Sequence, residues 1–570
     1  MKYWKLITFT LILLAIATRF AGIEWGLPYP MHPDERNMVI AVNQLSCPSF
    51  PSPDCLNPHF YAYGQFPLYL SYFMSQLQHA LHIPISTASV TLTLRFISAI
   101  ASLLTIYIQY QIVHRLFKLS YLQRVLALLS FIFVPVMIQL GHFGTTESLL
   151  MFFTSILTLW GIELVQGSLR LKSFMKKTAI VMGLALGTKV SALSLGVIPV
   201  LAIMISYKHD KRERRALTYA LSMVYFMMLT ALVFLISSPH NLINYQDFIN
   251  SIRYESSVGL GSYKAFYTRS FEYTLPVVFQ FFRVFPYALG WPLFSLSLLG
   301  FVFLPWNRTN LLLRGSVIIL FLSQAFIYAK WTRFLAPVYP ILIVLGVCLF
   351  LQLITRLRYQ VIALVACIFM IIPGVAYLSI YTTPDVRFQA SEWVYKNMPV
   401  DSKILAETAN VVDVPIPAPY MEKGLYDGKQ YDYISFNFYD MHMVPELQDE
   451  LDYHVSTADY VMIPSRRVFA NSTCYRFGTG KDAGRVWEDE LKQGYIMDRC
   501  ARLQADYPQV NEYYDELFAA DSDFKLVAEF TSYPRLTIFG KTIWEMPDEQ
   551  AEETWTVFDH PVVRVYQRTE

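Results

Sequence analysis

Charged residues are scarce in this 570-residue chain, at 16% of the sequence, whereas 54% of its residues are hydrophobic. The mean hydropathy is +0.35. A soluble protein of this length needs far more charge on its surface, so the composition excludes that class and predicts a polytopic membrane protein. The chain also lacks an excess of basic charge, because 46 Lys and Arg face 44 Asp and Glu. A nucleic-acid partner is therefore not expected.

Several chemical motifs are missing as well. The sequence has no glycine-rich phosphate loop, no convincing cluster of metal ligands, no internal repeat and no low-complexity segment. Nucleotide-dependent chemistry is not expected, and no cofactor is predicted with certainty. The one candidate for a divalent metal ion is His32, which stands beside Asp34 and Glu35.

Apolar segments long enough to cross a bilayer, about 20 residues each, fill the first two thirds of the chain. Nine are clear, at residues 6–25, 92–113, 125–140, 149–165, 216–236, 289–304, 311–328, 334–353 and 361–380. The first could also be a signal peptide, but no convincing cleavage site follows it, so we interpret it as a retained span.

Segment 178–205 is longer than one span and carries Lys189 near its middle, where a cation is costly. Two short helices, one ending near Gly187 and the next starting near Val190, would bring Lys189 to the outer boundary. We therefore predict about eleven spans, in agreement with the positive-inside rule. The basic loops expected in the cytoplasm are 114–124, 170–177, 208–215, 308–314 and 356–358.

The same orientation leaves four segments outside, provided that the amphipathic stretch 66–81 lies flat on the membrane. They are residues 26–90, 141–148, 237–286 and 381–570. We expect a transmembrane domain at 1–380, with a first outer loop at 26–90, and an extracytoplasmic soluble domain at 381–570. The protein is predicted to be a multi-pass component of the cell membrane.

The tail 381–570 changes character, with dense charge and short alternating apolar runs. Strands are expected at 403–407, 433–438, 460–463, 524–530 and 562–566, and helices at 388–396 and 485–493. This mixture predicts a compact α/β domain. Four cysteines fall outside the membrane, and an oxidising compartment would bond them locally, Cys47 with Cys55 and Cys474 with Cys500. Cys348 and Cys367 fall inside spans as small apolar residues.

Charged residues of both signs are predicted at the outer ends of spans. Such acids are usually solvated or cap helices, as Glu147 could after Thr146, and such cations usually snorkel to the interface. Their gathering on one face is nevertheless what transfer from an anionic lipid donor needs. The acids are Asp34, Glu35 and Glu147, and the cations are Lys189, Lys330 and Arg333.

Five segments, taken in order, resemble the landmarks of a known superfamily. They are Met31 to Glu35, Gly64 to Tyr69, Thr145 to Leu150, Gly183 to Lys189 and Arg333 to Pro340. In this order they resemble the protein O-mannosyltransferase and aminoarabinose-transferase superfamily, whose members are integral-membrane glycosyltransferases of the C-type fold. The resemblance covers roughly the first 380 residues, and 390–407 also looks like the start of the outer domain in prokaryotic members.

The resemblance implies a polyprenyl-phosphate sugar donor, an acidic catalytic residue in the first outer loop, and inversion at the anomeric carbon. Asp34 matches the base, Glu35 its partner and Glu147 the second outer acid, which is more often Asp in the family. The family's Pro-Pro before Leu-Tyr is Phe66-Pro67 here. The cations expected at the donor phosphate are Lys189, Arg333 and Arg36, and the side chains expected at the substrate are His32, Tyr63, Gln65 and Tyr69.

The acceptor of the sugar stays open among a protein, a lipid and a polysaccharide. Two alternative functions, each from another class of protein, also stay open. A transporter or lipid flippase with an outer accessory domain should carry ionisable residues near the bilayer midplane, and only the Lys189 region qualifies. A membrane-anchored recognition protein would leave the outer acids of the membrane half unexplained.

Overall fold

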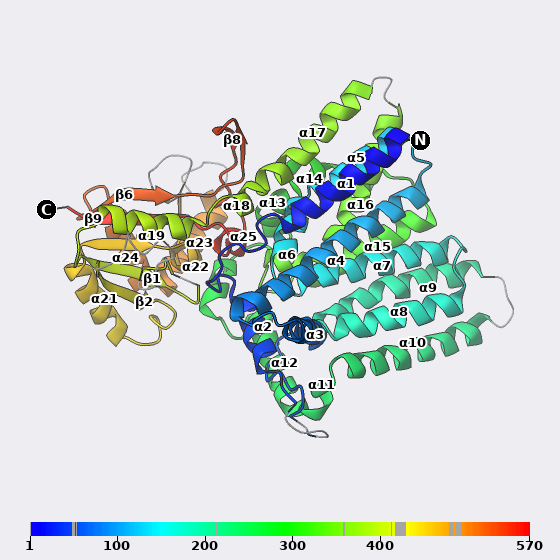
Figure 1. Cartoon of the computed structure of the whole chain (residues 1–570), viewed down its shortest axis with the longest axis horizontal. Helices are drawn as coiled ribbons and strands as arrows, with labels where there is room; N and C mark the ends of the chain where they lie inside the picture. The colour runs from blue at the N-terminus through cyan, green and yellow to red at the C-terminus, as the bar shows by residue number, and fades with distance from the viewer. Residues whose placement is uncertain are drawn as a thin grey trace.

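The computed structural model describes residues 2–47, 52, 54–210, 215–356, 360–411, 413–416, 429–477, 483–485 and 493–569. It has a helical unit and a sheet-containing unit, side by side (Figure 1). The first eleven elements are α1 (Lys2–Phe20), α2 (Pro33–Gln44), α3 (Phe66–Ala80), α4 (Thr87–Leu116), α5 (Tyr121–Ile132), α6 (Pro135–His142), α7 (Glu147–Val165), α8 (Leu171–Leu186), η1 (Val190–Gly196), α9 (Val197–His209) and α10 (Arg215–Ser237). The helical unit continues with α11 (His240–Ile243), α12 (Tyr245–Leu260), η2 (Phe266–Phe271), η3 (Gln280–Val284), α13 (Phe285–Leu289), α14 (Trp291–Phe303), α15 (Arg308–Ala325), η4 (Thr332–Leu335), α16 (Tyr339–Arg356), α17 (Gln360–Tyr377) and α18 (Ser379–Thr382).

Five stretches of helix are long and apolar enough to cross a membrane, and seven are if each of two bent pairs counts as one span. An integral membrane protein is therefore supported, but the predicted number of about eleven spans is not reached among the described residues. Two expected spans differ in shape. Residues 125–140 lie in α5 and α6, bent by 51°, and the span at 289–304 follows a sharp bend of 114° at Gly290, whose φ is 74°. The span at 334–353 begins at Tyr339, because Pro337 and Pro340 confine the α-helix to the residues that follow.

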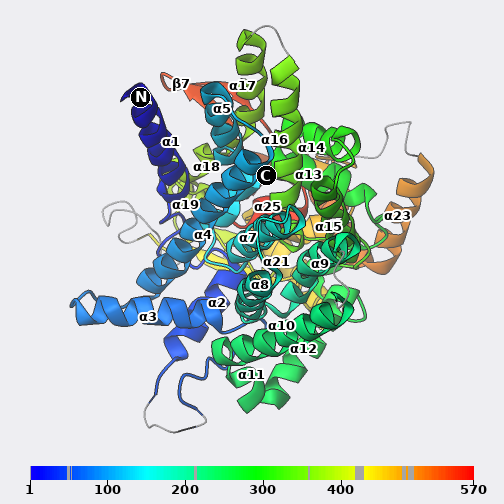
Figure 2. The same ribbon diagram turned by 90° about the vertical axis from the view of Figure 1, so that its right-hand side faces the viewer.

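The break predicted around Lys189 is present. α8 ends at Leu186, Lys189 is extended, and η1 begins at Val190. The second helix is not short, however, because Val190–His209 is long enough to cross. The stretch 66–81 forms α3, which Figure 1 shows end-on while α8 and α10 run lengthwise; Figure 2, turned by 90°, shows α3 lengthwise. α3 therefore crosses the direction of the bundle, as a helix lying on the membrane surface would.

The second unit is built on a sheet. Its elements are α19 (Val386–Asn397), β1 (Lys403–Thr408), β2 (Asp432–Asn437), α21 (Glu446–Thr457), β3 (Tyr460–Ile463), α22 (Arg467–Ser472), β4 (Tyr475–Phe477), β5 (Ala483–Arg485), α23 (Gln493–Asp506), α24 (Pro508–Leu517), β6 (Phe524–Phe530), β7 (Arg535–Ile538), β8 (Lys541–Glu545), α25 (Glu553–Val557) and β9 (Val563–Arg568). The five expected strands match β1, β2, β3, β6 and β9 within two residues. The expected helix at 388–396 is α19, whereas the one at 485–493 falls mostly outside the described residues.

The five-stranded sheet has the order β2-β1-β3-β9-β6. β1 is parallel to β2 and β3, and β9 is antiparallel to β3 and β6. Successive residues of β1 face opposite sides: Leu405 packs in the core under α22 and α24, while Ile404 and Ala406 pack in the core under α19. A sheet with both faces covered explains why β3, at its centre, is apolar and buried along its whole length.

One segment of the sheet unit returns to the helical unit. Between β8 and β9, the chain forms α25, whose Trp555, Val557 and Phe558 belong to the large apolar core of the membrane helices. Figure 1 shows α25 between the sheet and the helices. The two units are therefore joined by buried packing and not only by the linker after α18.

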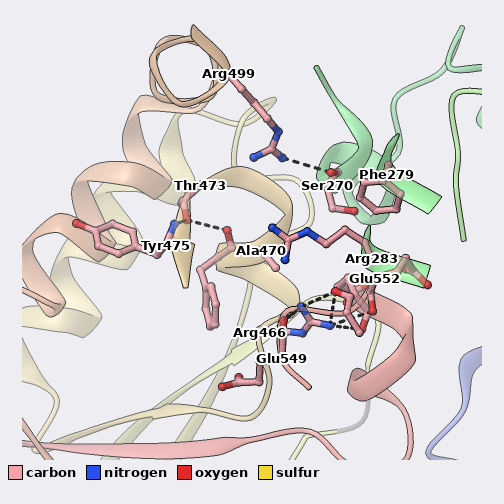
Figure 3. A pocket seen from close by; sticks show the side chains of 13 residues that line it. Ser270, Phe279, Arg283, Arg466, Ala470, Thr473, Tyr475, Arg499, Glu549 and Glu552 are labelled. Carbon is pink, nitrogen blue, oxygen red and sulfur yellow. Dashed lines mark hydrogen bonds between the residues drawn. The ribbon is translucent and has the colours of Figure 1, made fainter. Parts of the chain in front are cut away.

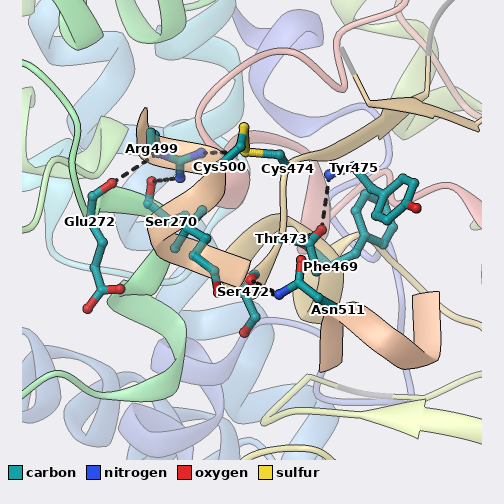
Figure 4. The surroundings of a disulfide bond; sticks show 11 residues. Ser270, Glu272, Phe469, Ser472, Thr473, Cys474, Tyr475, Arg499, Cys500 and Asn511 are labelled. Atoms are coloured by element: carbon teal, nitrogen blue, oxygen red, sulfur yellow. Dashed lines mark hydrogen bonds between the residues drawn. A yellow bond between two sulfur atoms is a disulfide. The ribbon is translucent and has the colours of Figure 1, made fainter. Parts of the chain in front are cut away.

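The two expected disulfides are formed. Cys47 is bonded to Cys55 in the first outer loop, and Cys474 to Cys500 in the sheet unit, while Cys348 and Cys367 are free and buried. Beside Cys500, the Arg499 guanidinium donates to the carbonyls of Ser270 and Glu272 at the end of η2 (Figure 4). The second disulfide therefore fixes an arm that holds the sheet unit against an outer loop of the helical unit.

The sidedness of the two units is a prediction that labelling tests. The Lys/Arg distribution puts the sheet unit outside and the loop 170–177 inside. We expect a membrane-impermeant thiol reagent to label Lys396→Cys in intact cells, and Lys176→Cys only after permeabilisation. Both positions are exposed, and the two native free cysteines are buried, so background should be low. Labelling of Lys396→Cys only after permeabilisation would contradict the orientation.

Candidate active site

Asp34 lies in the first turn of α2, which follows α1 after a series of turns. His32 caps this helix: its Nδ1 accepts from the backbone N–H groups of Asp34 and Glu35 at 3.2 and 3.4 Å. Pro33 stands at the first helical position, where its fixed φ and missing N–H are favourable. The Asp34 Oδ2 atom lies 2.8 Å from Arg333 Nη1, and the two side chains remain 20% and 17% exposed. Both side chains thus keep some contact with solvent, although the Asp34 Oδ2 atom itself is buried.

A second acid and cation lie beside the first pair. Glu147, the first residue of α7, has its Oε1 atom 3.0 Å from Lys189 Nζ at the break between α8 and η1. Lys189 also lies 4.8 Å from the centre of the Tyr63 ring and 5.6 Å from that of Phe334, next to Arg333. Four separate segments thus supply one cluster, which we call the charged cluster: Asp34, Glu147, Lys189 and Arg333.

Close backbone contact between the first outer loop and the α8–η1 turn brings Tyr63 to Lys189. The Gly64 N–H donates to the Thr188 carbonyl and the Phe66 N–H to the Gly187 carbonyl, both at 2.9 Å. A Cβ atom on Gly64 would lie 2.0 Å from the Gly187 carbonyl oxygen, so only glycine permits this approach. The landmark glycine therefore has a positioning role in this chain.

The charged cluster holds its acid in the ionised form. Burial alone raises the pKa of the Asp34 carboxyl, but Arg333, His32 and Lys189 together outweigh burial, and a hydrogen bond from Tyr63 adds to their effect, so the pKa lies below its ordinary value. Burial lowers the pKa of Arg333, whereas Asp34, Tyr63, Glu147 and Glu552 raise it to a net value above the ordinary one. Burial and Asp34 keep the pKa of Tyr63 well above 10. Asp34 is therefore a carboxylate, and Tyr63 is a neutral hydroxyl.

Glu35 does not share the site with Asp34. Its carboxylate is 1% exposed and forms a bidentate pair with Arg95, at 2.7 and 2.9 Å, while accepting from the Gly144 N–H at 2.7 Å. Arg95 also donates to the carbonyls of Ile23 and Trp25. Glu35 thus ties α2 to α4 and to the loop before α7, and its carboxylate is engaged there and not with Arg333.

Four further residues expected at the substrate or the phosphate are held by the protein itself. His32 caps α2, and burial lowers its pKa despite Asp34 and Glu35. Gln65 is buried and bonds Asn241 and the His240 N–H. The Tyr69 hydroxyl lies 3.1 Å from both the Gln65 Oε1 atom and the Leu56 carbonyl oxygen, either of which can accept its one proton. Arg36 donates to Asn410 in the loop after β1, so it contacts the sheet unit. Of the expected substrate side chains, Tyr63 and His32 lie beside the charged cluster, but the Nδ1 atom of His32 is used by the cap of α2.

Glu255, in α12 of the outer loop 237–286, was not among the sequence candidates. Part of its side chain is exposed. Burial of the rest, and then the Asp34 charge, raise the pKa of Glu255, whereas Lys189 and Arg333 lower it. An amphipathic helix in an outer loop was the only signal in the sequence, and it does not single out one acid. Glu255 is a third carboxylate within electrostatic reach of the charged cluster.

The charged cluster can hold an anion and accept a proton. Two cations stand next to two carboxylates in a partly exposed site, so an incoming phosphate can compete for the cations and leave a carboxylate free. Within the described ranges, no group of three or more His, Cys, Asp and Glu side chains is placed to hold a metal ion.

Comparisons with known proteins found likenesses among solved structures. No family model and no curated protein sequence matches the chain. The apo structure of ArnT, an aminoarabinose transferase, from Cupriavidus metallidurans is 14% identical, with a TM-score of 0.47, over 82% of this chain and 95% of that one. The same protein bound to undecaprenyl phosphate has a TM-score of 0.46 at 14% identity, over 84% and 98%. The apo oligosaccharyltransferase of Archaeoglobus fulgidus has a TM-score of 0.48 at 11% identity, over 100% and 89%. The functional conclusion therefore depends on the side chains of this chain.

Proposed function

We propose that the protein is a membrane glycosyltransferase that moves a sugar from a polyprenyl-phosphate donor to an acceptor hydroxyl at the outer face of the membrane. The transfer inverts the anomeric carbon, and Asp34 is the base. The observation that carries this proposal is the charged cluster, in which Arg333 holds Asp34 at 2.8 Å and Lys189 holds Glu147 at 3.0 Å. It is supported by the sequence landmarks, four of which supply the members of the cluster.

The two ion pairs are suited to binding an anion, because each keeps a cation in place that an anionic ligand can contact. Both cations can bond phosphate oxygens, and guanidinium groups do so in bidentate fashion. When a donor phosphate draws Arg333 away from Asp34, the carboxylate loses the neighbour that most lowers its pKa. The donor thereby makes the base stronger at the moment when it is needed.

The reaction is a single displacement. The acceptor oxygen attacks the anomeric carbon and gives its proton to Asp34, while the bond from that carbon to the phosphate oxygen breaks. The departing lipid phosphate takes the electron pair and gains one negative charge, which Lys189 and Arg333 stabilise. Tyr63, a neutral donor beside Asp34, can orient the acceptor hydroxyl or the sugar.

The direct test uses purified protein with a panel of polyprenyl-phosphate sugars. The readout is release of the polyprenyl phosphate, which is the same product for every acceptor. Mass analysis of glycans and lipid-linked sugars, in cells with and without the chain, then identifies the sugar and the acceptor. The proposal would be contradicted if lipid-linked sugars were the same in cells with and without the chain and if the purified protein released polyprenyl phosphate from none of the donors.

Removing either cation should weaken use of the donor. Charge-assisted bonds are stronger than neutral ones, so we expect Lys189→Ala and Arg333→Ala each to lower kcat/KM for the donor by about 10- to 100-fold. Because Lys189→Ala leaves the 2% exposed Glu147 carboxylate without its cation, rates are compared at equal amounts of folded protein. The matched control is Lys264→Ala, an exposed outer-loop lysine paired with Glu272, which should keep normal transfer. Equal loss in the control would contradict a specific role.

A further inference from the structure

Glu552 is a buried carboxylate of the sheet unit that lies at the edge of the charged cluster, against the residue before Arg333. It is 1% exposed and stands at the N-cap of α25. Its Oε2 atom accepts from the N–H and from the hydroxyl of Thr332, both at 2.9 Å, and from the Thr554 hydroxyl at 2.7 Å. Its Oε1 atom accepts from the Thr554 N–H at 2.8 Å. Four bonds thus fix this carboxylate, and two of them come from the residue next to Arg333.

The backbone of Glu552 is fixed as firmly as its side chain. Its N–H donates to the Arg283 carbonyl in η3 at 2.8 Å, and its carbonyl accepts from the Arg466 guanidinium at 2.9 Å. Arg283, Arg466 and Glu552 line the same small cavity (Figure 3). Glu552 therefore joins three segments: η3 and η4 of the helical unit and the loop before α22 of the sheet unit.

The connection continues through Thr332 to the reacting pair. Thr332 begins η4, and its carbonyl accepts from the Tyr339 hydroxyl at 2.8 Å. Arg333 follows, with its guanidinium 4.6 Å from the centre of the Trp331 ring and 2.8 Å from Asp34. Glu552 and Tyr339 thus hold the backbone of Thr332 from two directions, and that backbone sets where the Arg333 side chain starts.

A purely mechanical clamp would not need a charge. Burying a carboxylate is costly unless other groups compensate it, and every hydrogen bond described for the Glu552 side chain comes from a neutral donor. The negative charge acts on Arg333 without touching it, and favours its charged form. The contacts of Glu552 with Thr332 therefore hold the segment that carries Arg333.

We infer that Glu552 is the positioning residue through which the sheet unit orients Arg333 for the donor phosphate. The inference rests on the proposed function. It gives the C-terminal unit a defined part in donor binding, because docking of the segment 548–560 completes the phosphate site.

The test compares four variants. Glu552→Gln keeps the shape but removes the charge, and Thr332→Val keeps the branched shape but removes one donor. Thr332→Ser keeps both donors. Thr554→Val is the matched control, because it removes a bond to the same Oε2 atom without touching η4. Each variant is measured as full-length protein for kcat and KM with the lipid-linked donor, and for hydrogen exchange of the peptide around Thr332, whose amide reports the bond directly.

We expect Glu552→Gln and Thr332→Val to raise the KM for the donor by about tenfold, with a smaller change in kcat. The peptide around Thr332 should exchange faster in both variants, while Thr332→Ser and Thr554→Val stay near the unmodified chain. Equal losses in Thr554→Val would show a structural role alone and overturn the inference, as would a normal KM in Glu552→Gln. If the unmodified chain uses no lipid-linked donor, the proposed function is wrong. The positioning role of Glu552 is tested independently by hydrogen exchange, and unchanged exchange in Thr332→Val would contradict it.

Discussion

Asp34→Asn should lower the transfer rate by about 100- to 10,000-fold, the usual contribution of a general base. Asparagine keeps the size of the side chain and one oxygen for Arg333, but it cannot accept the acceptor's proton. Folding should survive, because Asp34 is 20% exposed and its backbone N–H, rather than its carboxylate, bonds the His32 cap. The measurement is release of lipid phosphate by purified protein, at equal amounts of folded chain.

Glu255→Gln is a useful companion variant. It removes a carboxylate that acts electrostatically on the same cations but is not paired with Arg333 among the described contacts. A base at Asp34 predicts a far larger loss for Asp34→Asn than for Glu255→Gln. If the Asn variant kept near-normal activity, Asp34 would not be the base, and Glu147 or Glu255 would have to take that part.

The sequence predicted best where a pattern is local. The five strands of the main sheet were found within two residues, since apolar alternation and flanking turns depend on neighbours in the chain. The short strands of the two small sheets, β4-β5 and β7-β8, were not predicted. The break at Lys189 was also predictable, because a lysine amid apolar residues has to reach a polar environment. In both cases the physical cause lies within about ten residues of the effect.

Contacts between segments that are distant in the chain could not be predicted from the sequence. Glu35 resembles a reacting partner of Asp34 because it is the next residue, but the helix turns its side chain toward Arg95, which is 60 residues away. Gln65 looked like a substrate contact, yet its partner Asn241 is 176 residues away. Nothing in the local sequence around 548–560 showed that this segment would leave the sheet unit and dock in the helical unit.

The same docking segment is the source of the second large expected effect. His560 is fully buried between two carboxylates, with Nδ1 at 2.6 Å from Asp559 and Nε2 at 3.0 Å from Asp548. Asp559 also accepts from the hydroxyls of Tyr377 and Tyr381 at the end of the membrane helices. The histidine thus holds together the acids that join the two units. Breaking a buried charge pair by removing one partner costs about 3 to 5 kcal/mol, so we expect His560→Gln to lower the free energy of unfolding by that amount.

The pH dependence of unfolding tests this assignment. Burial lowers the pKa of His560, but Asp559 and Asp548 outweigh burial and raise it to about 10. Because the folded pKa is above the ordinary value of 6.5, the stabilisation is fully present below pH 6.5 and is lost as the pH rises through 10. The free energy of unfolding of the unmodified chain, measured with denaturant or heat, should therefore fall as the pH rises across this window. For His560→Gln, the free energy of unfolding should change less with pH. The control His454→Gln, which alters a partly exposed pair with Glu450, should change stability by less than about 1 kcal/mol. A His560→Gln protein that kept both the stability and the pH slope of the unmodified chain would show that the two acids do not need the imidazolium to hold the units together.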